Sequence, residues 1–167
     1  MRILKKVLLA IVVSLTIVSC SKETIETIEE VNYAIDLNLA QETDWEMAEE
    51  VLKLVNEHRA TLGLNTIKKD QQHASAYAVD HTKYMIDMDE INHDNFDYRT
   101  EALKGRGAQK VGENVAFGYT DAQTLVNAWI SSTGHRRAIE GDFTHSGFGI
   151  IRNDVGTYYF TQLFYKI

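Results

Sequence analysis

Apolar residues at helical spacing come first in this 167-residue chain, and segments rich in aromatic and β-branched residues come last. We expect helices from Thr43 or Asp44 to Gly63, from near Asp70 to the acidic stretch before Asn92, over 96–104, and from Thr120 or Asp121 to an interruption at Gly134, with a last turn over 135–139. We expect strands at 146–151 and 157–164, joined by a hairpin turn at 153–156, and a third at 111–117. Helices followed by a small antiparallel sheet predict an α+β domain in which the sheet packs between helices.

The first nineteen residues have the pattern of an export signal. Arg2, Lys5 and Lys6 form a basic start, and a mostly apolar run follows from Val7 to Val18. As a helix this run would span roughly 18 Å, which is too short for a hydrocarbon core of about 30 Å. We therefore assign residues 1–19 to a signal peptide and not to a membrane span.

The single cysteine of the chain, Cys20, lies two residues after the end of that run. Ile17-Val18-Ser19-Cys20 is similar to a bacterial lipobox, which predicts that Cys20 is acylated and becomes the first residue of the mature protein. The alternative is a buried or free thiol that happens to lie near a signal peptide. Acylation predicts a membrane partner and a place in the cell envelope, at the outer membrane or the cell surface. It also leaves no thiol for a disulfide or for a cysteine nucleophile.

Residues 20–43 are predicted to connect this anchor to a domain that covers 44–167. The first part, from Ser21 to Glu30, is polar and acidic, as expected of a tether. Apolar residues then alternate with others over 31–40, which predicts a half-buried strand, with a frayed helix as the alternative. Part of the tether is therefore expected to dock on the domain.

The charge of the mature chain argues against nucleic acid as a partner. The leader carries three of the 17 basic residues and no acidic one, so the mature chain has 14 basic and 24 acidic residues. Such a surface repels phosphate backbones.

Several short motifs occur in a fixed order from Asp44 to the end of the chain. They are Asn56-Glu57-His58-Arg59-Ala60, His93 followed by Phe96 and Arg99, Gly112-Glu113-Asn114-Val115-Ala116, Trp129 to Arg136, Phe143-Thr144 before Gly147-Phe148-Gly149, and Tyr159-Phe160-Thr161-Gln162. Together they resemble the CAP superfamily of cysteine-rich secretory proteins, antigen 5 and pathogenesis-related plant proteins, and in particular its bacterial branch. The resemblance implies a three-layer α-β-α sandwich with a large cleft on one side.

The resemblance also implies which residues line that cleft. In the animal and plant members two histidines and two glutamates line it, and His93 and Glu113 match the first of each. The other two are replaced here by Ser132 and Tyr159, and His135 is the histidine of the bacterial branch. The usual cysteines of the family are absent, so core packing alone must hold the domain together.

The chemistry of His93, Glu113 and His135 allows two kinds of active site. Two neutral imidazoles and a carboxylate could hold a divalent metal such as zinc with one position open for water. Alternatively, Glu113 could orient a histidine that acts as a general base. Each of the three also has a structural alternative, since a loop or a short helix can use such side chains for hydrogen bonding and packing.

These observations lead to two main hypotheses for the function. The first is a lipid-anchored, non-catalytic binding module whose His/Glu-lined cleft recognises an extracellular ligand such as a lipid, a peptide or a protein. The second is a metal-assisted, peptidase-like hydrolase that uses His93, Glu113 and His135. A purely structural role in the envelope is a third. The sequence leaves open whether the protein is an enzyme at all.

Overall fold

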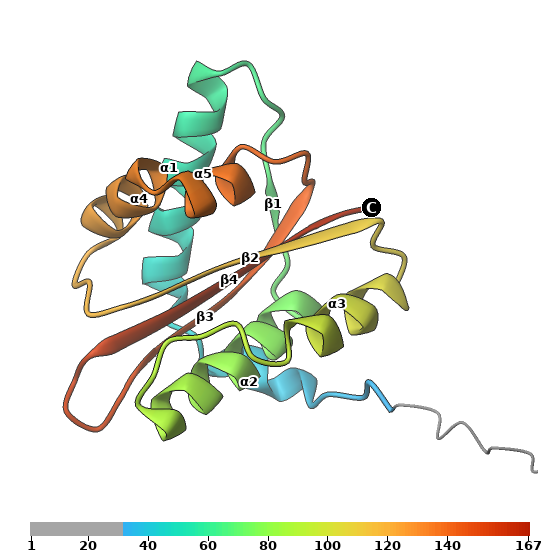
Figure 1. The fold of residues 1–167 in the computed structure, drawn as a ribbon, viewed down its shortest axis with the longest axis vertical. Coiled ribbons are helices and arrows are strands. Elements are labelled where there is room, and N and C mark those ends of the chain that lie inside the picture. Colours follow the sequence, from blue (N-terminus) through green and yellow to red (C-terminus); the bar gives the residue numbers. More distant parts are fainter. Residues whose placement is uncertain (1–31) are drawn as a thin grey trace, which may run out of the picture. The chain divides into compact units, whose positions relative to one another are not determined.

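A four-stranded sheet lies at the centre of the computed structural model, which describes residues 32–167 (Figure 1). The strands are β1 (Lys68–Lys69), β2 (Lys110–Phe117), β3 (His145–Arg152) and β4 (Tyr158–Lys166). Their order is β1-β3-β4-β2, in which β4 is antiparallel to both neighbours and β1 runs parallel to β3. The three longer strands confirm the sequence prediction, whereas β1 has only two residues and is too short to be recognised from the alternation of side chains.

The helices cover both faces of this sheet, as Figure 1 shows. They are η1, a 3₁₀ helix (Leu37–Glu42), α1 (Trp45–Thr61), α2 (His73–Met88), α3 (Phe96–Lys104), α4 (Ala122–Ser131) and α5 (Thr133–Ile139). Helices α1, α4 and α5 lie on one face, and α2, α3 and η1 on the other. The three-layer α-β-α arrangement predicted from the sequence is confirmed.

The side chains of β4 show how the sheet serves two cores. Phe160 and Phe164 are buried in the cluster that α1 and α4 cover, while Tyr159 and Leu163 are buried on the side of α2. Successive residues of a strand point to opposite faces, so a strand covered on both sides must be apolar at nearly every position. This explains why β4 is aromatic or aliphatic from Tyr158 to Tyr165, with only the buried Thr161 and Gln162 as exceptions.

Helix α2 lies unusually close to the sheet because glycines on β3 leave room for it. A Cβ atom on Gly149 would lie 2.2 Å from the carbonyl oxygen of Ala78, and one on Gly147 would lie 2.3 Å from the backbone of Ala74. Only a residue without a Cβ allows this approach. The close packing fixes the position of α2, whose later turns carry His81 toward β2.

The helix boundaries follow local capping, with two differences from the prediction. Asp44 caps α1 by accepting a hydrogen bond from the Met47 N–H at 3.0 Å, as expected. Helix α2 begins at His73 and not near Asp70, because the carboxylate of Asp70 accepts hydrogen bonds from the N–H groups of Gln72 and Ala74 at the start of the helix. It ends at Met88, within the acidic stretch before Asn92 as expected, since Asp89 adopts a left-handed conformation. The break between α4 and α5 lies at Ser132, whose backbone is extended, and not at Gly134.

The segment before α1 is part of the compact unit, which runs from Asn32 to Ile167. Tyr33 and Ile35 pack against the cluster between α2 and α3, and the hydroxyl of Tyr77 donates to the carbonyl of Tyr33. Thr43 joins β3, since its Oγ1 donates to the carbonyl of Phe148 at 2.8 Å. The domain therefore begins earlier than residue 44.

The secondary structure of that segment differs from the expected strand. Its first residues are irregular, and a 3₁₀ helix follows at Leu37–Glu42. The apolar residues Tyr33 and Ile35 pack against the cluster that contains residues of α2, and the segment over 32–40 forms no strand of the sheet within the described residues. The predicted signal segment, Cys20 and the first part of the tether lie outside the described residues.

Candidate functional site

A buried ion pair between Glu113 and Arg99 forms the centre of the candidate site. Glu113 lies on β2 and Arg99 on α3, and their side chains are 1% and 4% exposed. Arg99 Nε donates to Glu113 Oε2 at 2.8 Å and Nη2 donates to Oε1 at 2.9 Å. Such a two-pronged pair is strong and fixes the orientation of both groups. Burial lowers the pKa of Arg99, and the charge of Glu113 opposes that shift.

His93 is the exposed member of this cluster. Its Nδ1 lies 2.8 Å from Glu113 Oε1, and its side chain is 53% exposed. Because a carboxylate that pairs with Arg99 accepts hydrogen bonds, Nδ1 of His93 is the donor in this contact. The structure thus brings His93 and Glu113 together, as the family resemblance implied.

His81 is a fourth member of the cluster that the sequence did not reveal as a site residue. Its side chain is almost fully buried on α2, and its Nε2 lies 2.9 Å from the carbonyl oxygen of Asn92 and 4.0 Å from Glu113 Oε1. Burial and the charge of Arg99 lower the pKa of His81, so it stays neutral near Arg99. A histidine among the apolar positions of the predicted helix was the only signal for it.

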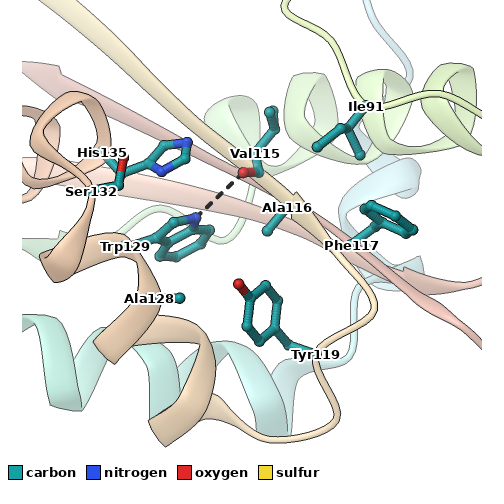
Figure 2. A pocket seen from close by; sticks show the side chains of 9 residues that line it. All are labelled: Ile91, Val115, Ala116, Phe117, Tyr119, Ala128, Trp129, Ser132 and His135. Carbon is teal, nitrogen blue, oxygen red and sulfur yellow. Dashed lines mark hydrogen bonds between the residues drawn. The ribbon is translucent and has the colours of Figure 1, made fainter.

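His135 lies in a separate pocket beside this cluster, at the junction of α4 and α5. Figure 2 shows the pocket, whose volume is about 250 Å³. It is lined by Ile91, Val115, Ala116, Phe117, Tyr119, Ala128, Trp129, Ser132 and His135. Burial lowers the pKa of His135, and the charge of His93 adds to the effect. His135 lines this pocket and is not among the side chains that contact Glu113.

Ser132, which the family resemblance also placed in the cleft, lines the same pocket. It occupies the N-cap position of α5, but its side chain makes no capping hydrogen bond. Within residues 32–167, its hydroxyl and the imidazole of His135 have no hydrogen-bond partner, so both are free to bind a ligand.

Two hydrogen bonds fix the wall of the pocket against β2. Trp129 Nε1 donates to the carbonyl of Val115 at 3.3 Å, the contact drawn as a dashed line in Figure 2. Asn114 Nδ2 donates to the carbonyl of His135 at 3.2 Å, and Asn114 is fully buried. Asn114 thus has a structural role, because it holds α5 on the sheet.

Tyr159 lies under the site and not in the pocket. Its side chain is 3% exposed and packs with Met85 and Val115. Its hydroxyl donates to Asp89 Oδ1 at 3.0 Å, which ties β4 to the end of α2. Tyr159 therefore supports β2 from the α2 side and does not offer its hydroxyl to a ligand in this pocket.

The geometry of the cluster does not fit a metal site. Within 32–167, no three His, Asp or Glu side chains are grouped so that they could hold a metal ion. Both oxygens of Glu113 already accept from Arg99, and His135 faces a different space. A zinc centre built from His93, Glu113 and His135 remains a prediction that this arrangement does not support.

Comparison with known proteins identifies relatives of this chain. The sequence profile of the cysteine-rich secretory protein family, CAP, matches residues 52–164. The uncharacterized membrane protein YlbC of Bacillus subtilis is 34% identical over 124 residues, which cover 70% of this chain and 34% of that protein. The uncharacterized protein YkwD of the same species is 31% identical over 108 residues, covering 62% of this chain and 42% of that protein. The matched region is thus less than half of either relative.

Solved structures share the fold. An outer surface protein of Borrelia burgdorferi has a TM-score of 0.65 at 23% identity and covers 72% of this chain and 92% of its own. An extracellular protein containing an SCP domain, from Bacillus anthracis, has a TM-score of 0.59 at 27% identity, covering 75% of this chain and 44% of its own. A cysteine-rich secretory protein of Staphylococcus aureus has a TM-score of 0.62 at 18% identity, covering 76% of this chain and 40% of its own.

Proposed function

This chain belongs to the CAP family, and on that premise we propose that it is an exported binding protein, held at the cell envelope by a lipid on Cys20. The pocket between β2 and the α4–α5 junction receives part of an extracellular ligand. The names of two structural relatives, an outer surface protein and an extracellular protein, support this location, as does the lipobox-like sequence. Within 32–167 no helix is long and apolar enough to cross a bilayer.

The state of Glu113 is the observation that favours a binding function over a metal-assisted hydrolase that uses this carboxylate. A general base must reach the proton that it removes, and a metal ligand must present a free lone pair. Glu113 is 1% exposed, and both of its oxygens accept hydrogen bonds from Arg99, so it faces no ligand and already has a cation as its partner. The cluster acts as a rigid support that orients His93 and joins α3 to β2.

The pocket has the composition of a recognition site. Apolar and aromatic side chains form most of its wall, and Ser132 and His135 supply polar groups at one side (Figure 2). A neutral imidazole offers one donor and one acceptor, so His135 can bind an amide or a hydroxyl. The volume of about 250 Å³ is below the roughly 300–1,000 Å³ typical of pockets that enclose a whole small molecule. It suits one apolar group of a larger ligand.

Titration of the full-length chain with soluble side-chain probes tests this function. N-acetyl-leucinamide and N-acetyl-tyrosinamide each present one apolar side chain with amide groups, and N-acetyl-glycinamide is the control without it. The indole N–H resonance of Trp129, assigned with a Trp45→Phe variant, reports on the pocket. We expect it to shift with the first two probes and not with the third.

A pair of variants on α4 separates the pocket from the surface. Ala128 lines the pocket, so Ala128→Phe should fill it and abolish the shift, while Asn127→Phe adds the same ring on the exposed side of the helix. Equal responses of both variants to the probes would remove the pocket as the binding site. Hydrolysis of either probe by the wild type would favour the enzyme hypothesis instead.

A further inference from the structure

Strand β2 is an edge of the sheet, and its hydrogen-bonding pattern shows which groups are free. Gly118 N–H donates to the carbonyl of Tyr158, and the register pairs Asn114 with Gln162. In an antiparallel ladder every second residue bonds to the neighbouring strand, and the residues between them direct N–H and C=O the other way. Val111, Glu113, Val115 and Phe117 therefore direct their backbone groups away from β4.

The exposure of Glu113 agrees with this assignment. Its side chain is 1% exposed, yet the residue as a whole is only half-buried, so its exposed surface belongs to the main chain. Val111 is half-buried as well. Outside the ladder with β4, the backbone groups of these two residues have no backbone partner within 32–167. A row of free N–H and C=O groups at a sheet edge is a template for another strand.

The pocket continues this edge toward the end of β2. The bond from Trp129 Nε1 to the carbonyl of Val115 confirms that this carbonyl points outward and marks where the pocket begins. Beyond it, Phe117 and Ile91 line the pocket although they are 51% and 40% exposed. Along β2, the free backbone groups of Val111 and Glu113 come first, and the apolar pocket follows from Val115 onward.

We infer that the ligand is an extended peptide segment that pairs with the free edge of β2 at Val111 and Glu113 and places one apolar side chain in the pocket. The inference rests on the proposed binding function and names the ligand class for the same site. Free backbone groups recognise any peptide main chain, and a pocket beside them selects a side chain. A lipid tail would fill the pocket but would leave the edge unpaired, which makes the two ligands distinguishable.

Selection of peptides from a random library provides the test. The full-length chain in detergent micelles is presented with displayed linear peptides of about nine residues, the length of a long strand, with counter-selection on empty micelles. Selected peptides are then resynthesised with a single N-methyl group at each position in turn. Pairing as a strand predicts a loss of affinity of about tenfold or more at every second residue and little loss at the residues between, since only alternate N–H groups face β2.

Substitutions in β2 provide the matched test on the protein. Val111→Pro removes an outward N–H without touching the ladder to β4, whereas Val111→Ala keeps the N–H and removes most of the side chain. We expect about tenfold weaker peptide binding for the first variant and nearly unchanged binding for the second, with cooperative unfolding retained in both.

The outcomes separate this inference from the proposed function. If no peptide is enriched, or if N-methylation shows no alternation and Val111→Pro binds as the wild type does, the pairing is refuted. Binding that is lost in Ala128→Phe but lacks the alternation would keep the pocket and reject the edge. Alternation that survives Ala128→Phe unchanged would keep the edge and reject the pocket.

Discussion

Removal of Arg99 should expose how much the fold depends on the buried ion pair. In Arg99→Leu the carboxylate of Glu113 stays buried but loses the two hydrogen bonds of 2.8 and 2.9 Å. Breaking a buried pair by removing one partner costs about 3–5 kcal/mol. At roughly 4 °C per kcal/mol for a unit of this size, the melting temperature should fall by about 12–20 °C.

The double variant Arg99→Leu, Glu113→Leu is the control that isolates the pair. Replacing both partners with apolar residues of similar size is often nearly neutral, so the double variant should recover most of the lost stability. Urea unfolding of the wild type, both single variants and the double variant, followed by circular dichroism, gives the coupling free energy. We expect this coupling to exceed about 2 kcal/mol. Additive losses, or a loss below about 1 kcal/mol for Arg99→Leu, would refute the reasoning.

His81 adds a pH dependence to the same experiment. The charge of Arg99 helps to lower the pKa of His81, whose Nε2 lies 4.0 Å from Glu113 Oε1. Without Arg99, His81 takes up a proton more readily and partly replaces the lost cation. The loss of stability in Arg99→Leu relative to the wild type should therefore be smaller near pH 5.5 than near pH 8. A deficit that does not change with pH would show that His81 does not respond to the pair.

Three further predictions follow from single features of the chain. Cys20→Ala should move the protein from the membrane fraction to the soluble fraction, and retention in membranes would refute lipid anchoring. A chain that starts at Asp44 should have a free energy of unfolding in urea lower by several kcal/mol than a chain that starts at Asn32, since the deleted segment packs on α2. Equal free energies of unfolding would contradict that contact. The wild type should lose stability as the pH falls below about 6.5, because the unfolded state then protonates His81 while the lowered pKa keeps the native one neutral. The stability of a His81→Gln variant should depend less on pH. An unchanged dependence would show that a group other than His81 causes the loss.

The sequence by itself determined the elements that depend on local spacing. The capping carboxylate of Asp44, the helical spacing behind it, and the aromatic run of β4 predict their elements because caps and side-chain periods act over a few residues. The order of helices before strands predicted the layered α+β fold, and the ordered motifs predicted the family.

Only the tertiary structure decided how the predicted site residues are used. His93 and Glu113 meet as expected, but Arg99 occupies both oxygens of the carboxylate, and His81 arrives from a third element. Tyr159 lies on the buried side of the sheet, where it bonds to Asp89 and not to a ligand. No spacing along the chain carries this information, because these contacts join residues from separate helices and strands.

The physical reason lies in the register of the sheet and the depth of helix packing. A shift of one residue in the pairing of β2 with β4 would turn Glu113 to the other face and leave Arg99 without its partner. The glycines of β3 set how closely α2 approaches, and so whether His81 reaches the cluster. Local patterns determine which elements form, whereas register and packing determine which side chains of those elements meet.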